Sequence, residues 1–276
     1  MDEARLIRIT DADDPRVEDF RDIRERDLTG RQGRFIAEGT VVLRVLADMH
    51  GRPGAVRAER LLILENRLAS VADILADFPA DVPVMVAPRA VMDRIAGFPI
   101  HRGVLAVAGR PAERSLAELM GSLPSRPLVL AASGIANHDN MGGLFRNAAA
   151  FGADAVLLDG ACCDPLYRKA IRVSVGAALR VPFVRAGSLI EMMAALSSAG
   201  VALWGLSPRG EEKIEEIAPV GGTALLVGTE GEGLPAELLG SIRTARIAQA
   251  PGLDSLNLAT ASGIALHSIA SAMGRI

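Results

Sequence analysis

Beyond residue 127, short apolar runs alternate with helical segments, and this alternation constrains the fold more than any other feature of the chain. LVLAAS, AVLLD, PFVRA, VALWGLS, TALLVGT and ARIAQ have the pattern of strands, and helices are expected from Met141, across 166–178, from Leu189 and from about Leu256. Strands that are apolar throughout, separated by helices, are typical of a mainly parallel sheet covered on both faces. The sequence therefore predicts a large α/β domain over residues 127–276.

A weaker alternation precedes this domain. Residues 32–109 contain the strand-like runs RLLILE, VPVMVAP and GVLAVAG, and the helical patterns FIAEGTVVLRVLADM, ASVADILADF and RAVMDRIAG. These patterns predict a smaller α/β domain. Residues 110–126 are rich in Pro and Gly and are expected to form a linker. The densely charged residues 1–31 are expected to be an extension with a solvated helix.

The composition limits how the chain can meet its partners. Half of its 276 residues are hydrophobic and 23% are charged, as in a folded globular protein. The formal net charge is -3, which argues against a protein held to nucleic acid by its overall charge, so any RNA contact must be local. Apart from Lys169 and Lys213, the basic residues are arginines, whose planar fork suits phosphates.

The cysteines and the N-terminus bear on the compartment. Cys162 and Cys163 are adjacent, so the sequence offers neither a disulfide framework nor the spacing of a metal site, and no metal is expected. The N-terminal residues MDEARLIRIT do not resemble a signal peptide, and no stretch approaches 18 uninterrupted apolar residues. We therefore expect a cytoplasmic protein without a membrane span.

The stretch DNMGGLFRNAAAFG, residues 139–152, follows the first strand of the large domain. An N-cap at Asp139 or Asn140 and a stop signal at Gly152 predict a helix between them. The two adjacent glycines lie one turn before Arg146 on the same face. Glycines beneath an arginine near a helix N-terminus would leave an open cationic shelf for a phosphate or carboxylate. The alternative is a capped helix with an exposed arginine.

Two further polar turns follow later strands, at the edge where open α/β sheets bind ligands. ALLVGTEGEGLP fails as a P-loop, because Leu234 stands where Lys is required, and it lacks the Rossmann glycines. The segment is therefore interpreted as a strand that runs into a tight turn with Glu230 exposed. The Glu230 carboxylate could hold a hydroxyl or a cationic ligand, and the alternative is an ordinary acidic turn. In APGLDSLNLATASG, Asp254 or Ser255 is expected to cap a helix, with Asn257 in its first turn.

In order, these three segments resemble the motifs of the SpoU (TrmH) family of RNA ribose 2'-O-methyltransferases, within the SPOUT superfamily. The segments match N-x-G-x-x-x-R, G-x-E-G-x-G and S-L-N, and RKAIRVSVGAAL is similar to the family's K-x-x-R-x-S-x-G-A segment. The part from FIAEG to HRGVLAVAG is similar, less specifically, to the family's L30e-like substrate-binding domain. The chain departs from the family at Ala248-Gln249, where Pro-Met is usual on the adenine side of the cofactor site.

The resemblance implies methyl transfer from S-adenosylmethionine to a ribose 2'-hydroxyl of structured RNA, either rRNA or tRNA, with rRNA slightly favoured. It also implies a homodimer and a trefoil knot in the C-terminal segment. By position, it implies a catalytic set and a cofactor-binding set. The catalytic set is Arg146, Asn140, Glu230, Ser255 and Asn257, and the cofactor-binding set is Gly228, Ile247 and Leu256.

The role of Arg146 needs a physical argument of its own. An arginine is effectively always protonated, so it cannot withdraw a proton from the hydroxyl. We expect Arg146 to clamp a phosphate and to stabilise the developing alkoxide, with the RNA phosphate or Glu230 accepting the proton. Two other readings stay open, a catalytically silent RNA-binding or ribosome-assembly factor on the same fold and an unrelated nucleotide-dependent α/β enzyme.

Overall fold

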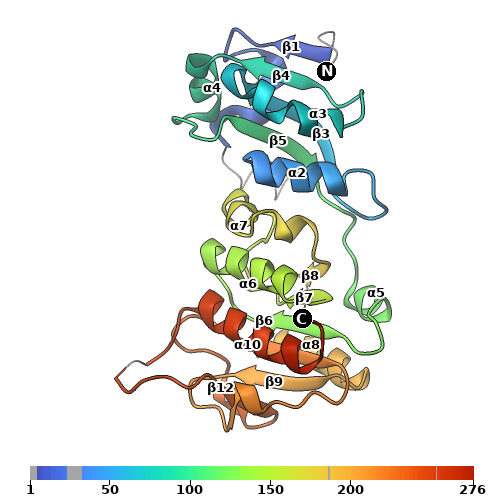
Figure 1. Cartoon of the computed structure of the whole chain (residues 1–276), viewed down its shortest axis with the longest axis vertical. Helices are drawn as coiled ribbons and strands as arrows, with labels where there is room; N and C mark the ends of the chain where they lie inside the picture. The colour runs from blue at the N-terminus through green and yellow to red at the C-terminus, as the bar shows by residue number, and fades with distance from the viewer. Residues whose placement is uncertain (1–4, 24–32, 186, 253) are drawn as a thin grey trace. The chain divides into compact units, whose positions relative to one another are not determined.

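The structure is a computed structural model that describes residues 5–23, 33–185, 187–252 and 254–276 (Figure 1). The chain divides into two compact units. The first comprises the residues up to Ala112 together with Leu166–Arg180, and the second comprises Glu113–Pro165 and Val181–Ile276. The segment Leu166–Arg180 thus packs with the first unit, although it lies within the predicted domain 127–276.

A parallel sheet organises the second unit. Within the described residues it has seven strands in the order β10-β12-β9-β11-β6-β7-β8, and neighbouring strands pair in parallel. The mainly parallel α/β fold predicted from the sequence is confirmed here. The strands are β6 (Leu128–Ala132), β7 (Ala155–Leu158), β8 (Phe183–Arg185), β9 (Ala202–Leu206), β10 (Glu212–Lys213), β11 (Thr223–Val227) and β12 (Arg243–Arg246).

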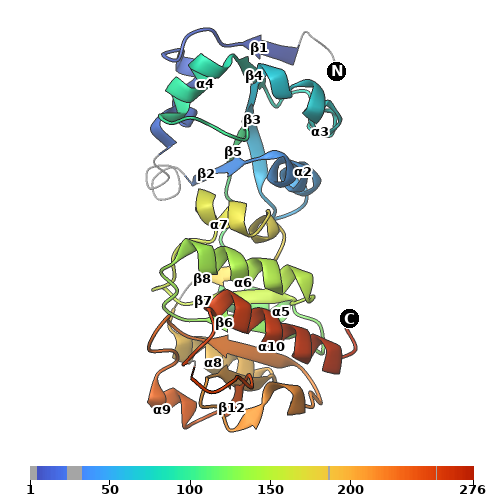
Figure 2. The same ribbon diagram turned by 60° about the vertical axis from the view of Figure 1, so that its left-hand side comes forward.

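Helices cover both faces of this sheet. One face buries Val129 and Ala131 of β6 in the same cluster as Leu189 and Met192 of α8. On the other face α6 and α10 lie side by side, as both views show (Figures 1 and 2). The helices of this unit are α5 (Leu116–Gly121), α6 (His138–Ala150), α8 (Leu189–Ser198), α9 (Ala236–Leu239) and α10 (Leu258–Ala272).

The strand order reverses at one place in the sheet. The chain moves from β6 outward through β7 to β8, and its later strands β9, β11 and β12 lie on the other side of β6. The carboxyl ends of β6 and β11 therefore lie side by side with their following loops running in opposite directions. Such a switch point is where open α/β sheets hold ligands.

A mixed sheet organises the first unit. In the described residues its order is β1-β4-β3-β5-β2, where β1, β4 and β3 are parallel and β5 is antiparallel to both of its neighbours. The strands are β1 (Leu6–Arg8), β2 (Arg34–Glu38), β3 (Arg57–Leu64), β4 (Val84–Ala87) and β5 (Val104–Gly109). The helices are α2 (Thr40–Met49), α3 (Ala72–Ala76), α4 (Arg89–Ala96) and α7 (Arg168–Val173).

Two predicted helices are shorter than the sequence suggested. The helical pattern of FIAEGTVVLRVLADM is wrong in its first part, because Arg34–Glu38 pairs with β5 and Gly39, at φ 98°, separates strand from helix. The helix expected across 166–178 ends at Val173. Val175 and Gly176 have φ values of 56° and 83°, which a right-handed helix does not accommodate.

The described part of the charged N-terminal segment, residues 5–23, does not form the solvated helix that its charge density suggested, and the rest of the predicted extension lies outside the described residues. In the described residues 5–23, β1 joins the sheet beside β4 and a 3-10 helix follows at Pro15–Ile23. Val17 and Phe20 of this 3-10 helix are fully buried in the core of the first unit. Apolar residues spaced among charges therefore dock this segment onto the sheet.

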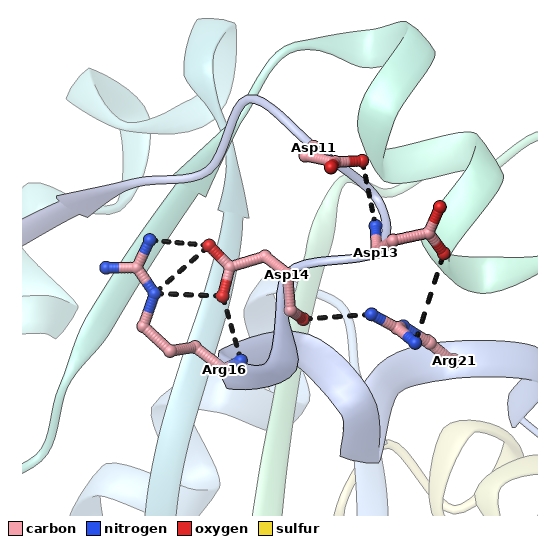
Figure 3. Close-up of polar contacts among 5 residues, drawn as sticks. All are labelled: Asp11, Asp13, Asp14, Arg16 and Arg21. Atoms are coloured by element: carbon pink, nitrogen blue, oxygen red, sulfur yellow. Dashed lines mark hydrogen bonds and ion pairs between the residues drawn. The ribbon is translucent and has the colours of Figure 1, made fainter.

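Arginines tie the same segment together (Figure 3). Arg16 donates two hydrogen bonds from Nε to the carboxylate of Asp14, at 2.9 and 3.1 Å, and Arg21 donates to the carbonyl oxygen of Asp14 at 3.1 Å. The hydrogen bonds from Arg16 lower the pKa of Asp14 from 3.8 to about 2. These contacts lie at the surface and shape the turn between β1 and the 3-10 helix.

Candidate functional site

Helix α6 starts earlier than the sequence predicted. Its N-cap is Asn137, whose side-chain oxygen accepts a hydrogen bond from the backbone N–H of Asp139 at 2.7 Å. Capping by Asp139 or Asn140 was therefore the wrong prediction, whereas the stop at Gly152, with φ 67°, is confirmed. Because Asn137 caps the helix, Asn140 lies inside the first turn and its amide is available for other partners.

Asn140 joins the three motif segments of the second unit. Its side chain is 4% exposed, its Nδ2 donates to the carboxylate Oε1 of Glu230, and its Oδ1 accepts from Nδ2 of Asn257 at 2.9 Å. Glu230 follows β11, and Asn257 precedes α10. The structure thus brings together three predicted catalytic residues at the switch point of the sheet.

Asn257 also begins the last helix. Its Oδ1 accepts from the backbone N–H groups of Ala259 at 2.9 Å and Thr260 at 3.3 Å, while its Nδ2 reaches Asn140. The caps predicted at Asp254 or Ser255 were therefore wrong. An amide can cap a helix through its oxygen and donate to a partner through its nitrogen at once, which an ionised aspartate in the same place cannot do.

The seam between α6 and α10 extends this contact along both helices. A Cβ on Gly143 would lie 2.4 Å from the Cβ of Ala259, so the glycine lets the helices approach closely. One turn further, Nδ2 of Asn147 donates to the carbonyl of Ala259 at 2.6 Å and to Oγ of Ser262 at 3.0 Å. The open shelf predicted beneath Arg146 is absent at this position, because α10 covers Gly143.

Asn147 was not singled out in the sequence. It stands seven residues after Asn140, a spacing that places both on one face of a helix, and this periodicity is the signal that would have found it. Arg146 lies next to this stripe and is exposed. Among the described residues it makes no hydrogen bond or ion pair, so its guanidinium is available to an external anion.

A cavity of about 310 Å³ opens at the carboxyl ends of β9, β11 and β12 and the start of α10. This volume lies within the usual range for small-molecule sites, roughly 300 to 1,000 Å³. Its lining includes residues of the predicted catalytic set and of the predicted cofactor-binding set. These are Gly228, Glu230, Ile247, Ser255, Leu256 and Asn257.

The turn after β11 exposes backbone to this cavity. A Cβ on Gly228 would lie 2.2 Å from the carbonyl carbon and oxygen of Gly233, so only glycine allows the turn to fold back here. Thr229 and Gly233 close the turn with backbone hydrogen bonds of 3.2 and 3.0 Å. Gly228, Gly231 and Gly233 all line the cavity, so a ligand there meets a turn with few side chains.

Asp159 is a buried carboxylate outside the three motif segments, and the sequence patterns did not single it out. It follows β7, is 7% exposed, and accepts hydrogen bonds from Oγ of Ser133 at 2.5 Å and from the backbone N–H of Gly134 at 3.1 Å. Burial would raise its pKa, but these bonds and those from Cys162 outweigh burial and hold the pKa below its ordinary value. Asp159 therefore fixes the chain that leads from β6 into α6.

Other kinds of site are not found in the described part of the chain. Its His, Cys, Asp and Glu side chains form no group of three or more suited to a metal ion. None of the helices in those residues has the length and apolar character needed to cross a bilayer.

Comparison with known proteins gives consistent matches. Residues 127–267 match the model of the SpoU rRNA Methylase family. An uncharacterised tRNA/rRNA methyltransferase of Mycobacterium tuberculosis is 40% identical over 269 residues, which cover 94% of this chain and 90% of the relative. A similarly named protein of Synechocystis is 27% identical over 95% of this chain and 93% of its own.

Two solved structures resemble the whole chain. The crystal structure of an AdoMet-bound rRNA methyltransferase from Sinorhizobium meliloti is 25% identical, with a TM-score of 0.78 over 96% of this chain and 97% of that one. The crystal structure of an RNA 2'-O ribose methyltransferase is 27% identical, with a TM-score of 0.79 over 98% of this chain and 99% of that one.

Proposed function

The chain belongs to the SpoU rRNA Methylase family, and from this membership we propose that it transfers a methyl group from S-adenosylmethionine to a ribose 2'-hydroxyl of rRNA or tRNA. The observation that carries the proposal is the hydrogen-bonded chain Asn257, Asn140 and Glu230 beside the cavity at the switch point. A polar cluster next to a ligand-sized cavity suits transfer between a small cofactor and a hydroxyl.

The residues around the cavity fit the cofactor. Ile247 and Leu256 offer apolar contact to a ring, and the side-chain-free backbone at Gly228 offers hydrogen bonds at close range. S-adenosylmethionine, when bound, supplies a methyl group on a sulfonium that a nucleophilic oxygen can displace. We propose that Gly228, Ile247 and Leu256 hold it, with Ser255 at the same wall.

The catalytic work of the chain is divided between a carboxylate and a guanidinium. Asn140 engages one oxygen of Glu230 and fixes its orientation, so the carboxylate is placed to accept the proton of the 2'-hydroxyl. Because arginine is a cation suited to phosphates, we propose that Arg146 holds a neighbouring phosphate and stabilises the negative charge that develops on the oxygen. Asn257 keeps Asn140 in place from the other side.

Arg146→Ala tests this assignment. We expect calorimetry to give nearly unchanged binding of S-adenosylmethionine, and we expect transfer of a labelled methyl group to RNA to be lost. Arg114→Ala, an exposed arginine before α5, is the matched control and should keep normal transfer. Normal turnover of Arg146→Ala would disprove the role of Arg146. Wild-type protein that binds no cofactor at millimolar concentration would favour the silent RNA-binding factor instead.

We place the RNA backbone on the first unit, at an arginine patch formed by Arg67, Arg102, Arg168 and Arg172. A Cβ on Gly39 would lie 2.9 Å from Cδ of Arg102, and a Cβ on Gly103 would lie 3.2 Å from Cγ of Arg67. The aliphatic parts of both arginine side chains therefore pack directly against the backbone of a glycine. Arg67 and Arg102 are exposed and form no ion pair among the described residues. Two such guanidiniums suit the phosphates of a nucleic acid.

The other half of the arginine patch comes from α7. Glu38, at the end of β2, is 5% exposed and lies 2.8 Å from Nη1 of Arg168 and 3.6 Å from Nη1 of Arg172. The guanidinium of Arg168 also stands 5.0 Å from the ring centroid of Phe98, which is 36% exposed. An exposed aromatic ring beside arginines can stack on an unpaired base. The RNA affinity of variants in which arginines of the patch are replaced by glutamate tests this part of the proposal.

Three further features are proposed on the same grounds. The first unit is taken as an L30e-like substrate-binding domain, the C-terminal segment as a trefoil knot, and the active protein as a homodimer. The knot is supported by the strand order, because the chain leaves β12 beyond β9 and returns to pack α10 against β11 and α6. Sedimentation equilibrium tests the dimer, and a purely monomeric protein would contradict it.

A further inference from the structure

We propose that Gln249 recognises the adenine ring of the bound cofactor through its side-chain amide, and so determines the specificity of the cavity for an adenine base. This inference rests on the proposed function, because it concerns the base of the cofactor assigned there. It gives a role to a residue at which the sequence departs from the family, since Gln249 stands where methionine is usual.

The first observation is an unsatisfied acceptor. Gln249 lines the cavity, and its Oε1 is buried without a hydrogen-bond partner among the described residues. The other such atom, Oγ1 of Thr223, lies at the start of the central strand β11 and does not line the cavity. Buried acceptors in proteins nearly always have partners, and this one gains a partner if the side chain turns toward a donor on a ligand in the cavity.

The second observation is the position of Gln249 in the sheet. It follows β12, whereas Glu230 follows β11, and β9 lies between these two strands. Two strand spacings separate their carboxyl ends by about 10 Å. Ile247 and Gln249 line the cavity on the β12 side, so we place the base of a cofactor whose methyl group faces Glu230 on that side.

The third argument is chemical complementarity. A primary amide pairs with adenine through two hydrogen bonds, because its oxygen accepts from the 6-amino group while its nitrogen donates to the neighbouring ring nitrogen. The last torsion of a glutamine side chain is broad, so Oε1 can turn from its buried position toward the cavity at little cost. Leu206 and Ile247 line the same cavity and offer apolar contact to the faces of the ring.

The test compares two ligands on two proteins. The ligands are S-adenosylhomocysteine, which transfers no methyl group, and its analogue with hydrogen in place of the 6-amino group. The proteins are the wild type and Gln249→Met, which nearly preserves side-chain volume and removes both amide groups. We expect the wild type to prefer the amino ligand in calorimetry, and we expect that preference to shrink about tenfold in Gln249→Met.

The possible outcomes distinguish a failure of the role of Gln249 from a failure of the proposed function. An equal preference in both proteins would overturn the role of Gln249, and so would a wild type that binds both ligands equally. A wild type that binds neither ligand would contradict the proposed function itself. Gln249→Glu guards against a variant that fails to fold, because a carboxylate still accepts from the amino group but cannot donate to the ring nitrogen. It should therefore keep the preference for the amino ligand while binding both ligands more weakly than the wild type.

Discussion

At the scale of single residues, Asn140 is the point where distant parts of the second unit meet. It donates to Glu230, 90 residues away, and accepts from Asn257, 117 residues away. Only a side chain with both a donor and an acceptor can do this in a buried position, which an aspartate of the same shape could not when ionised. The amide therefore sets the orientation of a carboxylate without competing with it for charge.

A second residue-scale feature is Asp159, for which we predict a pH-dependent contribution to stability. Its pKa is lowered in the folded protein from an ordinary value of 3.8. The stabilisation is therefore fully present above that value and is lost as the pH falls through the lowered pKa. Near neutral pH, Asp159→Asn should lower the free energy of unfolding by about 1 to 3 kcal/mol, because Ser133 and the loop N–H groups lose a charged acceptor.

Urea unfolding at several pH values measures this effect. The difference between wild type and Asp159→Asn should be constant from neutral pH down to about pH 4 and should shrink at lower pH. Asp77→Asn removes an exposed carboxylate and serves as the control, with little change expected. A difference that does not vary with pH would show that Asp159 acts by shape and not by charge.

At the scale of elements, the seam between α6 and α10 depends on a missing side chain. Gly143 lies against Ala259, and Asn147 donates to Ala259 and Ser262 one turn further along. A glycine inside a helix costs stability relative to alanine, by about 1 kcal/mol, so its presence here has to be offset by the close contact. The same close approach brings the start of α10 to Asn140.

For this seam we predict that Gly143→Ala destabilises the protein by about 1 to 3 kcal/mol, although alanine favours helices. The new Cβ would lie 2.4 Å from that of Ala259 and would force the helices apart. Gly121→Ala, at the end of α5 where a Cβ would meet nothing within 4 Å, is the matched control and should be neutral or stabilising. Denaturant unfolding measures both, and equal effects would contradict the packing argument.

At the scale of the whole molecule, the first unit is completed by a segment from the second half of the sequence. Arg168 of α7 pairs with Glu38 of β2 across 130 residues of chain, and Gly176 lies against Val45 of α2. The helix that supplies half of the arginine patch therefore follows β7 and precedes β8 of the other unit in the chain. RNA bound at this patch would therefore contact a helix whose flanking chain segments, before Leu166 and after Arg180, both belong to the second unit.

The whole-molecule prediction concerns RNA affinity. Arg67→Glu combined with Arg102→Glu should weaken binding of structured RNA, because fewer phosphates are then neutralised by the protein. The slope of log affinity against log salt should fall by about 1 for each phosphate that no longer has an arginine partner. Binding of S-adenosylmethionine should not change. Fluorescence anisotropy at several salt concentrations measures the effect.

The control for this prediction reverses two exposed arginines elsewhere on the first unit. Arg52→Glu combined with Arg57→Glu changes the net charge equally, and these residues lie before and at the start of β3, whereas Arg67 follows its end. An equal loss of affinity in both pairs would show that overall charge, and not the arginine patch, binds the RNA.

Patterns in the sequence were enough to establish the parallel α/β class of the second unit, the order along the chain of β6, β7, β8, β9, β11 and β12, and the three polar turns beside them. They were enough because apolar periodicity and turn residues are local signals. Tertiary contacts were needed to show that β6 and β11 are neighbours, that Asn137 and Asn257 are the caps, that Gly143 serves helix packing, and that Leu166–Arg180 belongs with the first unit. Periodicity tells which face of an element is buried but not which partner buries it, and local preference cannot choose among donors and acceptors that lie a hundred residues apart.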